Sequence, residues 1–464
     1  MNLKLIVASA VLFAAGTLLM AGSASAQFGG QVKVSNVIEG GVGGVSTARC
    51  GNNVVVGFAD AEASNPNSFD GVAVSRNGGK TFRDLGTLPT PPVDPNVGPA
   101  TLGTNFNNPH GQSNPSVACA NSNLFYYASI YITSGNECSN QGGGCAAISI
   151  STSANGGITW GLPVIASLQG ADVFEFVSPS MAVDPTNPSR LYIAYIDFNI
   201  TSFFFQDCFV ESYSVDIVES IDGGKTWTQP RPVDHACNGG ANDPTLTGSL
   251  ATPNITVSPQ GYVYVTDEFV GQTGNPNAIH FLSSLDHGNS FNAPLNVSTQ
   301  ATSNAFPQLA VDRTSSGSRG AIYLTWSGSQ TGTYTDTLVS ESLDGGASFS
   351  FPRPVSSAPS GGSGRFQSNP VIAVDNDGQI QACFYETPTN QPTDSSVYSY
   401  NCATSLNQAI AWQVTPIIAA APVGYDAVAA DFLLQNDGFF TAFELTSAGQ
   451  RYVVGYRFDD RPTC

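Results

Sequence analysis

Carboxylate side chains recur directly after short apolar runs in this 464-residue chain. Where several such groups converge, they can share a proton, hold Ca²⁺ or accept hydrogen bonds from sugar hydroxyls. The alternative is that they are solvated acids in loops. The candidates for ligand binding are Asp60, Asp197, Asp267 and Glu268, together with the histidines His110 and His235. Two histidines from different units are not a metal-ligand set, so we predict no metal site and leave Ca²⁺ binding by the acids open.

A turn phrase, Ser-x-Asp-Gly-Gly-Lys-Thr-Trp, recurs along the chain, and its sharpest copy is residues 220–227. Its two glycines permit the positive φ of a tight hairpin, and its Asp or Asn side chain can bond the amides of the turn. A single carboxylate bonded to its own turn is a weak ligand set. The phrase therefore predicts a structural turn rather than a metal or sugar site. Copies begin at Ser75, Ser153, Ser220, Ser284 and Ser342, with a worn copy at Ser405.

A second phrase, Pro-x-apolar-Ala-Val-Asp, alternates with the first, and its clearest copies are residues 179–184 and 307–312. With diverged copies at both ends, the chain holds seven. Each copy predicts a hairpin of strands A and B, and the turn phrase adds strands C and D. Four strands in seven units predict an all-β, seven-bladed β-propeller of antiparallel blades, with six blades as the alternative. Residues 27–464 divided by seven give about 63 residues per blade, which matches the repeat period.

The two ends of the chain predict how the ring closes. The last unit lacks a D strand, whereas an unassigned strand, residues 31–37, precedes the first A strand. We predict that this N-terminal strand completes the last blade, because closure removes an open sheet edge. The A–B turns and the turn phrases then share one face, the bottom. The B–C and D–A connections share the other face, the top, where acids at the ends of B strands would surround the channel.

Nine cysteines in an exported chain predict a disulfide framework with one cysteine left over. We predict the pairs Cys138–Cys145, Cys208–Cys237 and Cys383–Cys402. A Cys50–Cys464 bond would latch the closed ring and leave Cys119 free, and this is the preferred third pair. The alternative is Cys50–Cys119.

Residues 1–26 have the form of a secretory signal, with Lys4 before an apolar stretch and Ala-Ser-Ala before Gln27. We therefore expect one domain, residues 27–464, that is secreted to the extracellular space or the periplasm as a monomer. No later apolar segment is long enough to cross a bilayer. The formal net charge of −19 disfavours nucleic acids and anionic membranes as partners.

The turn phrase resembles the Asp-box, or BNR repeat, of the sialidase-like β-propeller superfamily. Five good copies extend the resemblance over nearly all of residues 27–464. Asp-box propellers include sialidases, xyloglucan hydrolases, sorting receptors and assembly factors, so the resemblance implies a fold and no single activity. Together with the acidic top face, it favours binding of an extracellular ligand, namely a glycan, a glycoconjugate or a protein.

A divergent sialidase-like glycoside hydrolase is the alternative function. Residues 424–426 and the apolar strand that follows are similar to the last sialidase blade, where a tyrosine nucleophile opens the first strand. On this resemblance, Tyr425 would be the nucleophile, and Glu386 or Glu444 would take its proton. A sialidase holds its substrate with three arginines, whereas only Arg365 is expected at the top here. Whether the protein is an enzyme stays open at this point.

Overall fold

The computed structural model describes the blades of the protein and many of the turns between their strands. The described residues are 31–36, 38, 44–60, 70–89, 109–133, 145–169, 173–199, 208–209, 211–302, 304–314, 319–330, 334–356, 365–375, 377–389, 398–405, 409–421, 431–435, 438–447 and 450–457.

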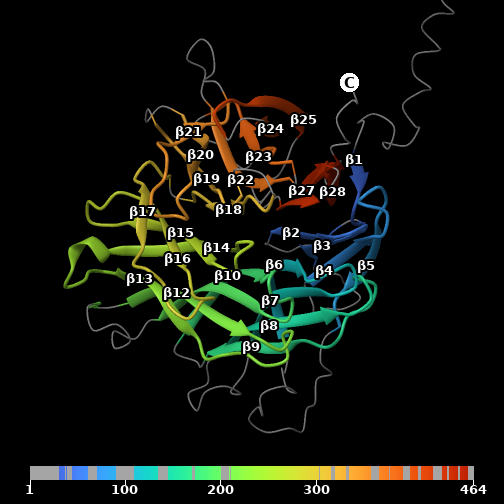
Figure 1. The fold of residues 1–464 in the computed structure, drawn as a ribbon, viewed down its shortest axis with the longest axis horizontal. Helices are drawn as coiled ribbons and strands as arrows, with labels where there is room; N and C mark the ends of the chain where they lie inside the picture. Colours follow the sequence, from blue (N-terminus) through green and yellow to red (C-terminus); the bar gives the residue numbers. More distant parts are fainter. Residues whose placement is uncertain are drawn as a thin grey trace, which may run out of the picture.

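Seven four-stranded antiparallel sheets form the blades of a propeller, as predicted (Figure 1). In blades one to six, the strands are neighbours in chain order. Blade one has β2 (Val45–Cys50), β3 (Asn53–Ala59), β4 (Asp70–Ser75) and β5 (Arg83–Thr87). Blade two has β6 (Pro109–Cys119), β7 (Phe125–Thr133), β8 (Cys145–Ser153) and β9 (Val164–Gln169). Blade three has β10 (Val173–Val183), β11 (Leu191–Asn199), β12 (Glu211–Ser220) and β13 (Arg231–Asn238).

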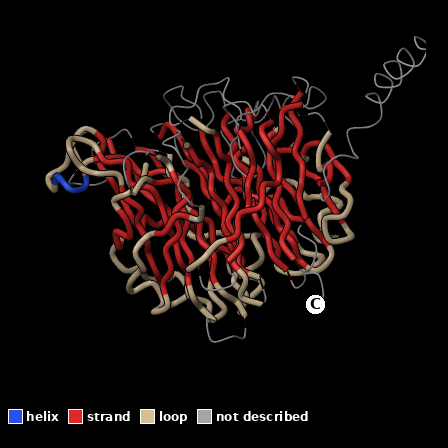
Figure 2. The backbone as a smooth tube through the Cα atoms, turned by 90° about the horizontal axis from the view of Figure 1, so that it is seen from above, coloured by secondary structure: helices blue, strands red, loops and turns tan. Residues whose placement is uncertain are grey.

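The remaining blades repeat the same plan. Blade four has β14 (Gly248–Val257), β15 (Val263–Gly271), β16 (Ala278–Ser284) and β17 (Leu295–Ser298). Blade five has β18 (Gln308–Val311), β19 (Ile322–Gly328), β20 (Asp336–Ser342) and β21 (Arg353–Pro354). Blade six has β22 (Phe366–Val374), β23 (Ile380–Thr387), β24 (Tyr398–Ser405) and β25 (Gln413–Ala421). A short 3-10 helix, Pro244–Leu246, precedes β14 and lies at one edge of the molecule (Figure 2).

Blade seven joins the two ends of the chain, as predicted. It contains β26 (Asp431–Gln435), β27 (Gly438–Ser447), β28 (Gln450–Arg457) and, beside β28, the N-terminal strand β1 (Gln31–Lys33). Val32 lies opposite Gly455 in this pairing. The contact continues past β1, where Ile38 bridges to Arg451. The last blade therefore gains its fourth strand from the start of the chain, and the ring closes.

The hydrophobic core lies between neighbouring blades. Tyr192 and Ile196 of β11 pack in one cluster with Val263 and Val265 of β15, and all four are fully buried. A B strand is covered on both faces by adjacent blades, so its sequence is nearly continuous in apolar residues. A polar residue on such a strand is therefore placed in the core and needs a partner.

The turn phrase is a bonded turn that also contacts the preceding blade. In blade three, the Gly224 amide donates to Ser220 Oγ at 2.9 Å, and the Thr226 amide donates to Asp222 Oδ1 at 3.0 Å. In blade two, Gly157 has φ of 88° and packs on blade one, because a Cβ there would lie 2.4 Å from a methyl group of Val55. The phrase thus sets the spacing between blades as well as the hairpin.

Three disulfides lie within the described residues. Cys208–Cys237 and Cys383–Cys402 are the pairs predicted from the sequence. The preferred Cys50–Cys464 latch is wrong, because Cys50 is bonded to Cys119, the alternative partner. Both cysteines end inner strands, β2 and β6, and line one cavity, so their sulfurs meet across adjacent blades. Residue 138 of the predicted Cys138–Cys145 pair and residue 464 lie outside the described residues.

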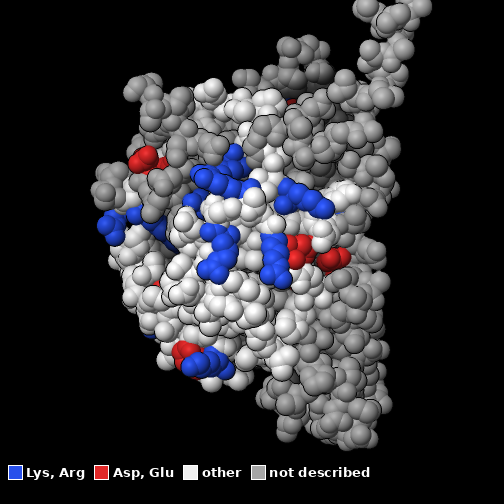
Figure 3. Space-filling view, turned by 90° about the vertical axis from the view of Figure 1, so that its right-hand side faces the viewer, with Lys and Arg blue, Asp and Glu red and all other residues white. Residues whose placement is uncertain are grey.

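The surface charge is uneven despite the net charge of −19. Figure 3 looks onto the side that carries β1 and β5, where several Lys and Arg side chains gather. The exposed ones on these strands and the adjoining turn are Lys33, Arg76, Lys80 and Arg83. Among the described residues, no helix has the length and apolar character needed to span a membrane.

Candidate functional site

The predicted acids lie on or beside B strands, but they are largely buried rather than solvated. Asp60 directly follows β3, Asp197 lies in β11, and both are less than 7% exposed. Asp267 and Glu268 of β15 are fully buried. The alternative of solvated loop acids therefore does not describe these four groups. Each carboxylate has to be understood through its partners.

The side chain of Glu268 stabilises the segment that leads into blade five. Its Oε2 accepts a hydrogen bond from the Ala305 amide at 2.7 Å. Burial raises the pKa of Glu268 to about 7, although amides of the 304–306 segment lower it. Asn304 and Phe306 have φ of 64° and 50°, which are uncommon for residues other than glycine. Glu268 thus links blade four to the segment that leads into blade five.

Arg365 and Glu386 belong to one network between blades five and six, called here the arginine network, in which Arg365 is buried and Glu386 is half-buried. Arg365 pairs with Asp336, and its Nη1 donates to Ser356 Oγ at 3.1 Å. Gln367 Nε2 donates to Ser356 Oγ at 2.9 Å and to Glu386 Oε2 at 2.5 Å. Because Arg365 is only 5% exposed and paired, its charge is neutralised within the protein. This is a poor arrangement for holding the carboxylate of a substrate.

The predicted catalytic residues, Tyr425, Glu386, Glu444 and Arg365, do not all come together within the described residues. Tyr425 lies outside them. Glu444 is 3% exposed and pairs with Arg451, whose Nη2 lies 2.6 Å from Glu444 Oε2. The structure therefore joins Arg365 to Glu386 but leaves the role of Tyr425 a prediction.

The predicted histidines occupy different environments. His110 belongs to β6, and its side chain lies outside the described residues. His235 lies in β13 opposite Ser214, and its backbone amide donates to Asp234 Oδ1 at 2.7 Å. A third histidine, His280, meets two acidic groups at once.

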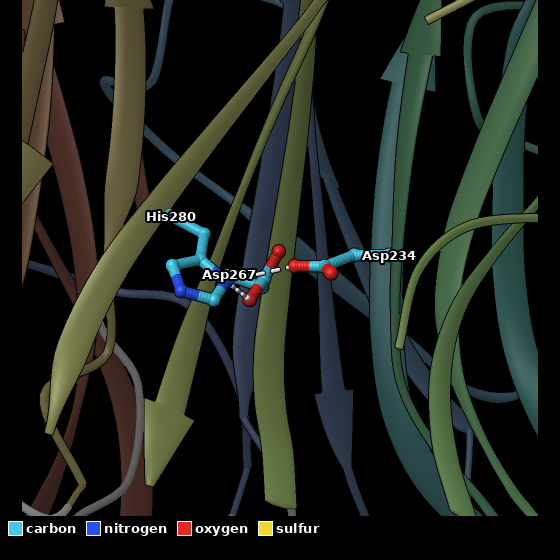
Figure 4. A group of neighbouring side chains, drawn as sticks. All are labelled: Asp234, Asp267 and His280. Atoms are coloured by element: carbon cyan, nitrogen blue, oxygen red, sulfur yellow. Dashed lines mark hydrogen bonds and ion pairs between the residues drawn. The ribbon is translucent and has the colours of Figure 1, made fainter. Parts of the chain in front are cut away.

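His280, Asp234 and Asp267 form a compact cluster at the interface of blades three and four (Figure 4). His280 Nδ1 lies 2.8 Å from Asp234 Oδ2 and 3.6 Å from Asp267 Oδ1. The ligand atoms of the three residues all lie within 4.8 Å of one another. The signal that could have pointed to His280 is its place in the apolar strand β16, where a polar side chain requires a partner.

The electrostatics of this cluster follow from its burial. Desolvation raises the pKa of Asp267 well above its usual range, the charge of Asp234 raises it further, and His280 opposes both effects. Desolvation lowers the pKa of His280, but the hydrogen bond and the charges of the two acids outweigh it and leave the pKa raised. The cluster therefore favours additional positive charge.

The inner strands carry a ladder of side-chain hydrogen bonds from blade to blade, called here the inner ladder. Each bond joins the polar residue of one inner strand to a backbone amide of the next. The bonds are Val117 N to Ser46 Oγ at 2.9 Å, Met181 N to Ser116 Oγ at 2.9 Å, Ile255 N to Ser180 Oγ at 3.1 Å and Leu309 N to Asn254 Oδ1 at 2.9 Å. The variable residue after proline in the second phrase supplies three of these acceptors. This role was not predicted from the sequence.

A central cavity of about 180 Å³ is lined in part by the acceptor residues of the inner ladder. Among the described residues that line it, none is ionisable. Hydroxyl and amide groups contribute instead, including Asn114, Ser178, Thr252 and Asn369, each of which precedes a proline. Ser178, Thr252 and Asn369 have φ of 55°, 45° and 51°, a conformation that a residue before proline rarely adopts.

Comparison with known proteins shows the fold alone. No protein-family model matches the sequence, and no curated protein matches it. A polysaccharide lyase titled PL25 ulvan lyase is 11% identical, with 94% of this chain and 95% of that chain covered and a TM-score of 0.50. The intramolecular trans-sialidase from Ruminococcus gnavus is 12% identical over 75% of this chain and 95% of its own, with a TM-score of 0.48. A Dyadobacter fermentans protein of unknown function is 12% identical over 76% and 95%, with a TM-score of 0.47.

Proposed function

We propose that this protein is an exported propeller that binds an extracellular glycan or glycoconjugate at the top of its channel. The observation that carries the proposal is the central cavity, whose described lining offers neutral hydrogen-bonding groups and no ionisable side chain. The three disulfides support maturation in an oxidising compartment.

The chemistry of the lining suits sugar hydroxyls. A sugar hydroxyl both donates and accepts hydrogen bonds, and so do the side chains of Asn, Ser and Thr. A neutral cavity binds such groups without the desolvation penalty of a buried charge. At about 180 Å³, it is smaller than the roughly 300–1,000 Å³ of typical ligand pockets, so we expect it to admit one sugar unit of a larger glycan.

The backbone around the cavity supports a binding role. Ser178, Thr252 and Asn369 repeat the same positive φ before proline in three different blades. Backbone strain of this kind costs on the order of 1–3 kcal/mol per residue and concentrates at functional sites. Repetition around one cavity is consistent with side chains and carbonyls aimed at a ligand.

Binding of the purified protein to a glycan array tests the proposal. We expect Asn369→Asp to weaken binding of the selected glycan at least about ten-fold, because the amide donor is lost from a site built for hydrogen bonds. Asn77→Asp is the matched control, since it makes the same change in a turn phrase and produces the residue found there in other copies. Failure of the wild type to bind any glycan, or equal binding by Asn369→Asp, would refute the proposal.

A glycoside hydrolase is the second candidate, and it rests on Tyr425 as the nucleophile with Glu386, which accepts a hydrogen bond from Gln367 Nε2, as the group that would take its proton. Incubation with a panel of aryl glycosides tests it. A hydrolase of this type predicts release of the aryl group by the wild type and its loss in Tyr425→Phe. Equal rates for the two proteins exclude Tyr425 as the nucleophile.

A further inference from the structure

We propose that Asp234, Asp267 and His280 form a binding site for a divalent transition-metal ion between blades three and four. This site is separate from the central cavity and does not depend on the proposed glycan function. Its three ligands come from three strands, β13, β15 and β16, so the fold rather than a local motif brings them together.

The distances among the three side chains fit one coordinated ion. Metal bonds of about 2.0–2.2 Å to nitrogen and oxygen place neighbouring ligand atoms roughly 3.0–3.5 Å apart. The two separations from His280 Nδ1, 2.8 Å to Asp234 Oδ2 and 3.6 Å to Asp267 Oδ1, lie on either side of this interval. The ligand atoms of the two acids lie within 4.8 Å of each other, so side-chain rotations would have to bring them closer to complete the geometry.

Asp267 supplies an independent indication that a ligand is needed. Its side chain is fully buried, and neither of its carboxylate oxygens accepts a hydrogen bond from a described residue. Buried polar groups are normally satisfied, and an exception calls for an ion, a water or a proton. Its carboxylate is directed toward that of Asp234 and toward His280 (Figure 4).

The surroundings hold the ligands in position. The backbone amide of His235 binds Asp234 Oδ1 at 2.7 Å and leaves Oδ2 to face His280. The ring of Phe269 stacks on the imidazole of His280, with centroids 5.4 Å apart and an angle of 20° between the planes. Orientation of ligands by neighbours of this kind is typical of protein metal sites.

The donor set indicates the class of ion. One imidazole nitrogen with two carboxylates suits Zn²⁺ or a related first-row ion better than Ca²⁺, which prefers six or more oxygens. The two ionised acids and a neutral imidazole would balance a charge of +2. The side chain of His280 is 17% exposed, against 5% for Asp234 and 0% for Asp267, so an ion from solvent would meet the imidazole first.

The competing explanation is a proton rather than a metal. Two facing carboxylates can share one proton, and His280 can be protonated beside them. Asp267→Asn separates the two explanations. It preserves shape and can mimic a protonated Asp267, yet it removes a metal ligand.

Zinc uptake by the purified protein is the direct test. After treatment with a chelator and exposure to zinc, we expect about one zinc ion per chain by mass spectrometry and a higher melting temperature than without zinc. Asp267→Asn and His280→Gln should each lower the zinc affinity by about 100-fold or more. Should His280→Gln fail to fold, the isosteric Asp267→Asn still decides the question.

The matched control is His287→Gln. His287 also lies beside a buried acid, with Nδ1 3.5 Å from Asp184 Oδ2, but it belongs to no cluster of three ligands among the described residues. We expect this variant to retain wild-type zinc affinity. The proposal is overturned if the wild type binds no zinc, or if Asp267→Asn binds it as tightly as the wild type.

Discussion

The arginine network and the cluster of Asp234, Asp267 and His280, called here the metal-site cluster, both bridge neighbouring blades, but their balance of donors and acceptors is opposite. In the arginine network, Arg365 and Gln367 supply N–H groups to the carboxylates of Asp336 and Glu386, with Ser356 between them. A guanidinium carries five donors and stays charged, so a buried acid beside it remains neutralised. Nothing further has to bind for this interface to be stable.

The metal-site cluster has an excess of acceptors. Two carboxylates share one imidazole, which carries at most one hydrogen on the nitrogen that faces them. Buried carboxylates in this propeller therefore fall into two groups. Those matched by fixed donors join blades, whereas those left unmatched are the ones that we propose bind a cation.

Removal of Arg365 should produce the largest effect. We expect Arg365→Met to lower the free energy of unfolding by about 3–5 kcal/mol, because the charge of Asp336 stays buried without its partner. Replacement of both partners, Arg365→Met with Asp336→Leu, should recover much of this loss. Without metal, Asp267→Asn should not lower stability, because it relieves like-charge repulsion. Urea unfolding measures all three variants, and a loss below 1 kcal/mol for Arg365→Met would contradict the distinction between the two networks.

Asp216 of β12 is a buried acid outside both networks, and its pKa shift arises mainly from burial. It therefore tests the effect of burial alone. Burial raises its pKa from 3.8 to about 6, although a hydrogen bond from Ser214 opposes the rise. An acid with a raised pKa contributes most stability below pH 3.8, and this contribution is lost as pH rises through 6. Relative to Asp216→Asn, the wild type should therefore lose up to about 3 kcal/mol between pH 4 and pH 7. Urea unfolding at both pH values measures this change, and parallel stability curves for the two proteins would rule it out.

The repeats predict the architecture because each blade carries its own local signals. The missing D strand of the last unit and the unassigned N-terminal strand predicted the closure by β1. The partner of Cys50 could not be chosen in this way, because the repeat pattern left both Cys119 and Cys464 open as partners. Only the adjacency of β2 and β6 around the channel decides it.

Which acids can form one site depends on which neighbouring blade each side chain faces. Asp267 and Glu268 are adjacent, so in a strand they point to opposite faces. Asp267 faces blade three and meets Asp234, whereas Glu268 faces blade five and binds the Ala305 amide. The sequence pattern had predicted both at the mouth of the channel. His280 was missed because its acidic partner Asp234 lies 46 residues earlier, in another blade.

Removal of Asp222 in the turn phrase should have the smallest effect on stability. Its side chain accepts hydrogen bonds but is not deeply buried, so it serves as a reference for the buried acids of the two networks. It accepts hydrogen bonds from the amide of Thr226 at 3.0 Å and from its hydroxyl at 2.7 Å. These bonds lower its pKa to about 2, so its contribution is present above pH 3.8 and is lost as pH falls through 2.

We expect Asp222→Ala to lower the free energy of unfolding by about 1 kcal/mol at pH 7, since exposed hydrogen bonds contribute little net stability. Asp222→Asn, which keeps one acceptor oxygen, should lose less. Urea unfolding measures both. A loss for Asp222→Ala as large as that for Arg365→Met would mean that hydrogen bonding, and not neutralisation of buried charge, gives the arginine network its strength.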